Sequence, residues 1–134
     1  MRVVVDTNIF ISAALKENSL PGVVLQIVER SGGLLKSSAT EQELLVTLAR
    51  PRLVRLVPAP FLEWVTELLA AAEPVAITER ITACRDAGDD KFLELAVNGR
   101  ADLIISGDGD LLALNPFRDI PIVTPAVFVQ GVTR

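Results

Sequence analysis

Short apolar runs rich in β-branched residues alternate along this chain with longer amphipathic stretches. That alternation is typical of an α/β domain, in which parallel strands are joined by crossover helices. Each run is short and mostly apolar, as strands buried on both faces of a sheet are. The predicted strands are Arg2 to Val5, Leu34 to Ser37, Val75 to Ile77, Leu103 to Ser106 and Ile122 to Val123.

Helical stretches fill the gaps, and several have recognisable ends. Ser19 with Pro21 opens one helix, Thr40 opens another, Gly99 closes a third, and Thr124 with Pro125 opens the last. Residues 50–60 hold three prolines, which predicts a loop or a short helical turn. Residues 82–90 are polar and contain a glycine, so they predict a loop that delivers two aspartates to a helix start.

Length and composition predict one globular domain covering residues 1–134. Half of the 134 residues are apolar, as in a domain with an ordinary core. The longest apolar runs are far shorter than the roughly 20 residues that a membrane-spanning helix needs. The first strand runs straight into Asp6 and leaves no room for a secretory signal. We therefore expect a cytoplasmic protein without membrane contact.

The residue inventory excludes several kinds of chemistry. The chain has no histidine and one cysteine, Cys84, so it cannot build a Ser-His-Asp triad, a Cys-His pair, a Cys/His zinc site or an intrachain disulfide. Any hydrolysis must use carboxylates, metals or lysine. The net charge of −4 argues against a broadly basic nucleic-acid surface. Contact with nucleic acid would have to be local and assisted by metal.

Four acids fall where a common site would form. In an open α/β sheet, ligands bind at the carboxyl ends of the strands. Asp6 follows the first strand and Asp108 follows the fourth, while Glu43 and Asp90 lie near the starts of helices. Clustered carboxylates repel one another unless a proton or cation neutralises them, and hard oxygen ligands suit Mg²⁺ or Mn²⁺. Such ions can polarise a phosphoryl oxygen and activate water without histidine.

Each acid also has an ordinary structural explanation. Asp6 could cap a helix, and Glu43 fits a capping box opened by Thr40. Asp89 and Asp90 would favour a helix dipole in any case, and the stretch from Asp108 to Asp110 could be a plain turn. Only the combination of several acids at one sheet edge favours a site.

Four stretches carry a resemblance to a known family. They are residues 3–15, residues 37–51, residues 84–96 and residues 101–112. In their order and spacing they resemble the PIN-domain nucleases, and within that family the toxin components of bacterial type II toxin-antitoxin pairs. The resemblance implies a three-layer α/β/α sandwich with a mostly parallel sheet. It also implies an endoribonuclease that cleaves single-stranded RNA with Mg²⁺ or Mn²⁺.

The resemblance assigns residues and partners. Its acidic quartet falls on Asp6, Glu43, Asp90 and Asp108, with the metal held by the three aspartates. Asp89 competes with Asp90, because the family helix can be placed on either; Asp90 keeps the run to Asp108 free of gaps. The supporting residues are Asn8, which helps to hold the first aspartate, Ser106, which stands where threonine is usual, and Asp110, in the outer sphere of the metal. Family members of this kind usually dimerise and are silenced by an antitoxin, so a homodimer and an antitoxin partner are expected.

Other functions fit the sequence less well. A haloacid-dehalogenase phosphatase needs a second aspartate two residues after the first, where this chain has Asn8. A receiver-like domain needs an acidic pair before the first helix and a late lysine near the site, and neither is found. A PIN-like interaction module without turnover stays open, because all four acids would be present in it too.

Overall fold

Five short parallel strands form the centre of the computed structural model, which describes residues 1–16 and 18–133. Strands β1, β4 and β5 form one sheet in that order, and β2 and β3 form a second. A parallel bridge between Val3 and Leu34 joins them, with the Val3 N–H donating to the Gly33 carbonyl at 2.8 Å. The strands therefore follow the order β3-β2-β1-β4-β5. Their bounds are β1 Val3–Val5, β2 Leu35–Lys36, β3 Glu73–Pro74, β4 Leu103–Ile105 and β5 Ile122–Val123.

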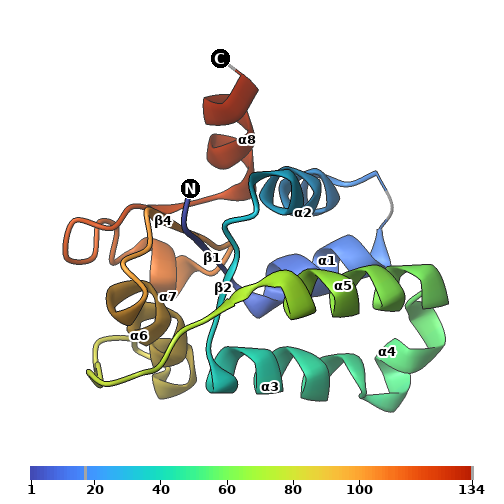
Figure 1. The fold of residues 1–134 in the computed structure, drawn as a ribbon, viewed down its shortest axis with the longest axis horizontal. Helices are drawn as coiled ribbons and strands as arrows, with labels where there is room; N and C mark the ends of the chain where they lie inside the picture. Colours follow the sequence, from blue (N-terminus) through green and yellow to red (C-terminus); the bar gives the residue numbers. More distant parts are fainter. Residues whose placement is uncertain (17, 134) are drawn as a thin grey trace.

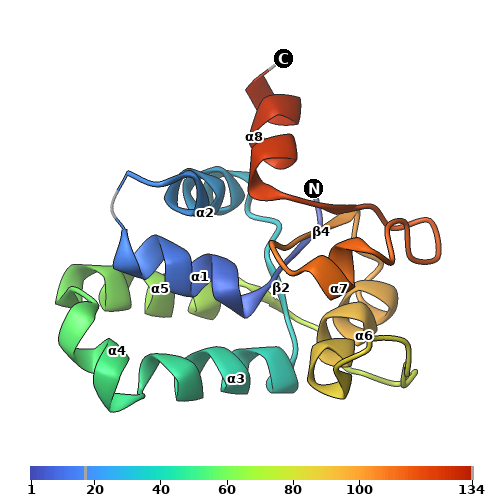
Figure 2. The ribbon, with the colours of Figure 1, turned by 180° about the vertical axis from the view of Figure 1, so that it is seen from behind.

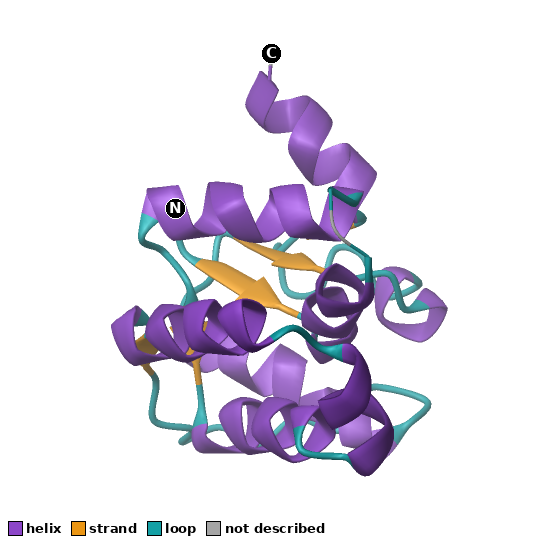
Figure 3. Ribbon diagram, turned by 90° about the vertical axis from the view of Figure 1, so that its right-hand side faces the viewer, coloured by secondary structure: helices purple, strands orange, loops and turns teal. Residues whose placement is uncertain are grey.

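Helices cover both faces of the strands (Figure 3). Successive strand residues point to opposite faces, so Val3 and Val5 join one buried cluster and Val4 the other. Helices α1, α2, α3, α5 and α8 contribute to the first cluster, and α6 and α7 to the second. Figures 1 and 2 show α6 and α7 on one side of β1 and β4, with α1, α2 and α5 on the other. The predicted three-layer α/β/α sandwich is confirmed.

The helices have these bounds: α1 Thr7–Leu15, α2 Leu20–Ser31, α3 Ser38–Leu48, α4 Pro51–Leu56, α5 Ala59–Ala71, α6 Asp90–Asn98, α7 Gly109–Leu112 and α8 Pro125–Thr133. A 3-10 turn, Ala87–Asp89, leads into α6. Residues 50–60 thus hold one short helix and the start of α5. No helix in the described part of the chain is both long and apolar enough to cross a bilayer.

Helix α3 begins earlier than its sequence suggested. The N-cap is Ser37 rather than Thr40: the Ser37 hydroxyl accepts the Thr40 N–H at 3.2 Å, and the Thr40 hydroxyl accepts the Ser37 N–H at 3.0 Å. This reciprocal pair is the capping box of the helix. The capping box between Thr40 and Glu43 is therefore wrong, and the Glu43 carboxylate is free for other contacts.

The third strand is also shifted, to Glu73–Pro74 instead of Val75 to Ile77. The Val75 N–H still donates to the Lys36 carbonyl at 2.8 Å, but the next amides leave the sheet. The side chain of Asn98 in α6 accepts the N–H groups of Thr78 and Glu79 at 3.1 and 2.9 Å. This long-range contact draws the chain away from β2 and ends the strand.

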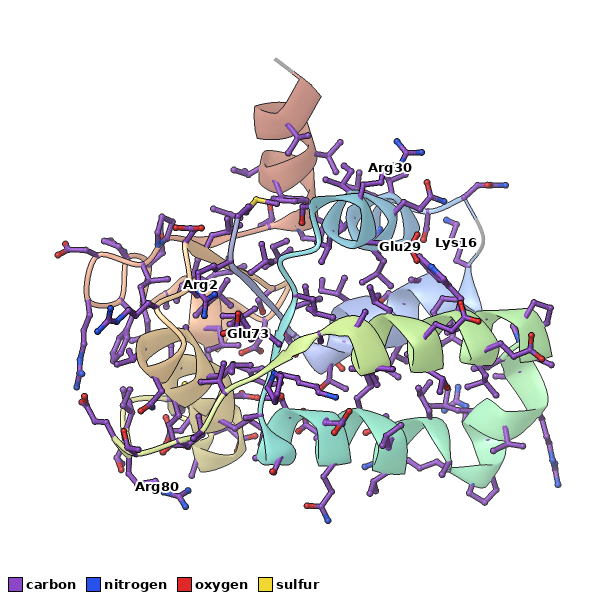
Figure 4. All side chains as sticks on the ribbon, viewed as in Figure 1. Arg2, Lys16, Glu29, Arg30, Glu73 and Arg80 are labelled. Atoms are coloured by element: carbon purple, nitrogen blue, oxygen red, sulfur yellow. The ribbon has the colours of Figure 1, made fainter. Side chains whose placement is uncertain are left out.

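An ion pair joins β1 and β3 at the end of the sheet where these strands begin. Arg2 donates two hydrogen bonds to the Glu73 carboxylate, at 2.8 and 2.7 Å, and a third to the Gly99 carbonyl at 2.9 Å. Figure 4 shows Arg2 and Glu73 pointing toward each other. The fork of a guanidinium suits this two-pronged contact with a carboxylate. Arg2 thus ties the start of β1 to β3 and to the end of α6.

Candidate active site

Asp6 and Asp108 lie next to each other at the carboxyl ends of β1 and β4, and a buried serine links them. Asp6 directly follows β1, and Asp108 is the N-cap of α7 after β4. The Ser106 hydroxyl donates to Asp6 Oδ2 at 2.8 Å and accepts the Asp108 N–H at 3.0 Å. Ser106 is fully buried, so this link is shielded from water. The serine hydroxyl fixes the orientation of Asp6 relative to the turn that carries Asp108.

The Asp6 carboxylate is buried, which disfavours its charged form. Only 3% of the residue is exposed. Burial raises the pKa of Asp6 above its usual value, and the charges of Asp108 and Glu43 raise it further, against the opposing effect of the hydrogen bonds from Ser106 and Asn8. Asn8 supplies its backbone N–H, at 3.3 Å from Asp6 Oδ1, while its side chain is exposed. The predicted support from Asn8 is therefore a main-chain contact.

Asp90 faces its own preceding loop. Its Oδ1 atom accepts the backbone N–H groups of Ala83 and Cys84 at 3.0 and 2.7 Å. The hydrogen bond from the Cys84 amide is the main reason why the pKa of Asp90 is lowered. The pKa of the Cys84 thiol is raised to about 12 by burial and by its hydrogen bond with Asp90. Asp90 thus fastens residues 83 and 84 to the start of α6.

Asp89 lies in the field of the other acids. The pKa of Asp89 is raised to about 6, first by burial and then by the charges of Asp108, Asp86, Asp6 and Glu43. Neighbouring residues on a helix point in directions about 100° apart, so Asp89 and Asp90 can serve different surroundings. The charges of Asp6 and Asp108 thus act on Asp89, while the Oδ1 atom of Asp90 accepts the loop amides. The gap-free spacing that favoured Asp90 carries no information about the two loop amides that donate to its Oδ1 atom.

Glu43 on α3 reaches the same site and is held by two residues that the sequence did not single out. The Thr7 hydroxyl donates to Glu43 Oε2 at 2.5 Å, and Lys91 Nζ forms an ion pair with Glu43 Oε1 at 2.9 Å. Thr7 directly follows Asp6 in the sequence, and Lys91 directly follows Asp90. A lysine directly after an acidic pair is the one sequence signal that could have identified Lys91.

Two further acids lie in the segments that carry Asp89 and Asp108. Asp110 lies half-buried in the first turn of α7, directly after Gly109. Asp86 caps the 3-10 turn, where its Oδ1 atom accepts the Gly88 N–H at 2.9 Å. Asp86 was not predicted as a site residue, yet its charge helps to raise the pKa of Asp89.

The donor set suits a divalent cation. All of its members are oxygen ligands, the kind that Mg²⁺ and Mn²⁺ prefer. Asp6, Asp89 and Asp108 form no ion pair within the described residues. Burial raises the pKa of Asp6 and Asp89, and the charge of Asp108 raises both further. Among residues 1–16 and 18–133, no three acidic or cysteine side chains are grouped closely enough to hold an ion by themselves. Mg²⁺ usually keeps several of its waters, and such a hydrated ion fits a carboxylate cluster of this kind.

The acid cluster predicts how stability depends on pH in metal-free protein. The pKa of Asp89 is about 6 in the folded chain and 3.8 when unperturbed, so the folded state holds a proton that the unfolded state has lost. The contribution of Asp89 to the free energy of unfolding is therefore fully present below pH 4 and is lost as pH rises toward and through 6. The raised pKa of Asp6 acts in the same direction. Urea unfolding between pH 4.5 and 7.5 in a chelator should show this fall.

A matched pair of variants isolates the contribution of Asp89. Asp89→Asn should flatten the pH dependence of the free energy of unfolding. Asp119→Asn removes the same charge from an exposed loop position with φ 67°, a conformation that asparagine tolerates, and should leave the dependence as in the parent chain. An unchanged slope in Asp89→Asn would contradict the assignment of Asp89 to the cluster.

Comparison with known proteins identifies the family of this chain. Residues 2–110 match the family described as PIN domain. The chain is also 30% identical over 119 residues to the uncharacterized protein MJ1680 of Methanocaldococcus jannaschii, a match that covers 85% of this chain and 75% of that protein. PIN domains are generally nucleases and typically use divalent metals such as Mg²⁺. The matched residues include all the acids of the site and most of the sandwich, and the chain belongs to the PIN-domain family.

Proposed function

We propose that this chain is a metal-dependent endoribonuclease that hydrolyses phosphodiester bonds in single-stranded RNA. The observation that carries the proposal is the pair of acids at the carboxyl ends of β1 and β4, Asp6 and Asp108, linked through the buried Ser106 hydroxyl. Burial, and then the charges of these acids and their neighbours, raise the pKa of Asp89 to about 6. A cluster with so much unneutralised charge favours a divalent cation. Without histidine in the chain, that cation is the natural agent for hydrolysis.

The residues divide the work as follows. Asp6, Asp89 and Asp108 would hold the ion, with Asp89 in the place first expected for Asp90. When bound, Mg²⁺ or Mn²⁺ supplies Lewis acidity and charge neutralisation at the scissile phosphate. Ser106 orients Asp6 through its 2.8 Å hydrogen bond. Glu43 would accept a proton from the attacking water, and Asp110 would accept hydrogen bonds from waters around the ion.

The preference for single-stranded RNA, and a role as the toxin of a type II toxin-antitoxin pair, rest on the family resemblance. The net charge of −4 supports a short, local contact with RNA rather than a long duplex track. An acidic site of this kind would also accept a basic side chain from an antitoxin. Size measurement of the chain alone, and with the product of a neighbouring small gene, would test the proposed homodimer and the proposed partner.

Cleavage assays with purified protein test the activity. End-labelled single-stranded RNA should be cut with added Mg²⁺ or Mn²⁺, spared in a chelator, and cut again when metal is restored. Single-stranded DNA and duplex RNA of the same sequence serve as comparison substrates. Cleavage in the chelator would refute the metal mechanism. Absence of cleavage of any single strand, with the metal bound, would favour the interaction module instead.

A further inference from the structure

The chain is acidic as a whole, but one segment of it is basic. Residues 44–62 contain three arginines, Arg50, Arg52 and Arg55, and no acidic residue, in a chain with a net charge of −4. All three arginines are exposed, and they lie on α4 or directly before it. Positive charge is therefore concentrated on one short stretch of the surface, which we call the arginine patch.

The arginine patch has no counter-charge in the folded chain. Within residues 1–16 and 18–133, none of its three side chains takes part in an ion pair or a hydrogen bond. Arg2 and Arg118, by contrast, form ion pairs with Glu73 and Glu79. Arginines without an internal partner are available to an external anion, and the planar fork of a guanidinium suits phosphate.

Helix α4 is attached to the domain by apolar contacts and not by its arginines. Val57, at the end of α4, is 6% exposed, and Leu53 packs against the first buried cluster. Arg50 takes part in the start of the helix only through its carbonyl, which accepts the Leu53 N–H at 2.9 Å. Arg52 and Arg55 are three residues apart, so they are neighbours on the surface of the helix. The fold thus presents the patch on a fixed element.

Helix α3 connects the arginine patch to the candidate active site. Figure 1 shows α4 following the end of α3 that lies away from α6. Glu43, Val46 and Arg50 are spaced three and four residues apart, as residues on one face of a helix are. With a rise of about 1.5 Å per residue, Arg50 lies about 10 Å from Glu43 along the helix axis. Val46 between them is 55% exposed. A strand that leaves the site along α3 would reach the patch within a few nucleotides.

We propose that the arginine patch binds backbone phosphates of the single-stranded RNA on one side of the cleavage site. This inference rests on the proposed ribonuclease function and names the surface that holds the strand outside the acidic site. Arginines that neutralise phosphates release counterions, which gives affinity without sequence preference. Carboxylates repel phosphates, so the separation of the patch from the acids lets one small domain carry both. The patch supplies the local contact that the net charge of the whole chain conceals.

RNA binding in a chelator tests the patch in the absence of cleavage. The probe is a fluorescent single-stranded RNA of mixed sequence, and its anisotropy gives Kd over a range of salt concentrations. The triple variant Arg50→Gln, Arg52→Gln and Arg55→Gln removes the charges and keeps side chains that favour helix. Each phosphate contact on a single strand contributes about 0.7 to the slope of log K against log salt, so the variant should show a slope shallower by about 2. Its Kd at low salt should be higher by a factor on the order of 10.

Three other basic residues supply a matched control. Lys16, Arg30 and Arg100 are exposed, form no ion pair within the part of the chain that the structure describes, and lie outside α3 and α4. Figure 4 shows Arg30 on the far side of the molecule from α3. Changing all three to glutamine alters the net charge equally and should leave Kd and slope as in the parent chain. An equal loss of binding in this control would show that net charge alone sets the affinity, and would overturn the proposal.

Competition with an acidic peptide separates RNA from a protein partner. An oligoglutamate that carries as many charges as the RNA should displace the labelled probe only at much higher concentration than unlabelled RNA does. Displacement at equal concentrations would assign the patch to an acidic protein segment instead of RNA, and would overturn the proposal.

The remaining outcomes separate this inference from the proposed function. Parental Kd and slope in the triple variant, or no RNA binding by the parent chain at low salt, would overturn the role of the patch. Cleavage of RNA by the parent chain with Mg²⁺ would leave the ribonuclease standing in either case. Weaker binding by the variant, with no cleavage by the parent chain, would support the patch and refute the ribonuclease. If the triple variant does not fold, Arg52→Gln and Arg55→Gln decide singly, and each should reduce the slope by about 0.7.

Discussion

Replacing Asp6 with asparagine is expected to lower the rate of RNA cleavage by a factor on the order of 100 or more, since even the neighbours of metal ligands typically contribute about 10- to 100-fold. The variant should stay folded. An asparagine oxygen can accept one of the two hydrogen bonds that Asp6 receives, and its amide can donate to the Ser106 hydroxyl, which rotates to suit. Loss of one charge from the repelling cluster also offsets part of the change.

The measurement is initial cleavage rates at saturating Mg²⁺, with circular dichroism to check the fold. Asp119→Asn, with the same charge change on an exposed loop, is the control and should cleave at the parental rate. Full activity in Asp6→Asn would refute the mechanism. Loss of activity in both variants would point to net charge instead of the site.

Alanine at Asp89 and alanine at Asp90 should have opposite effects on activity and stability. Asp89→Ala should lose cleavage on the order of 100-fold, with no loss of stability at pH 7, because the side chain makes no capping hydrogen bond and repels other acids. Asp90→Ala leaves the amides of Ala83 and Cys84 without their acceptor. Unsatisfied groups cost about 1–3 kcal/mol each when buried, but Ala83 is exposed and Cys84 half-buried, so water replaces part of the lost contact and we expect a loss of about 1 kcal/mol.

Urea unfolding in a chelator and cleavage at a temperature where both variants are folded measure the two effects side by side. The parent chain, and Asp119→Asn on the exposed loop, set the reference values. If Asp90→Ala proved inactive but stable, and Asp89→Ala unstable but active, the roles of the two aspartates would be exchanged.

The sequence by itself determined the fold class and the place of two acids. The alternation of short β-branched runs with amphipathic stretches depends on residues only a few positions apart, and local patterns of that kind predict strands and helices. Because parallel strands end at one edge of a sheet, Asp6 and Asp108 had to lie close together once their strands were identified. The residue inventory also excluded histidine and zinc chemistry before any coordinates were considered.

Only the tertiary structure decided between neighbouring residues of the same type. Asp89 and Asp90 have equivalent sequence surroundings, and the choice depends on loop amides at residues 83 and 84 and on carboxylates from other strands and helices. The limit of β3 likewise depends on Asn98, about 20 residues farther along the chain. The sequence allows a capping box between Thr40 and Glu43. In the structure the capping box is formed by Ser37 and Thr40, so Glu43 has no part in it.

Asp6, the first acid of the site, shows where the two sources of information meet. Its position after a strand was set by local pattern, and that position alone is equally suited to a helix cap. Its charge state is set by burial and by Asp108 and Glu43, which lie far away in the sequence. Electrostatic and hydrogen-bonding partners are chosen by distance in space, so a local pattern can place such a residue but cannot assign its role.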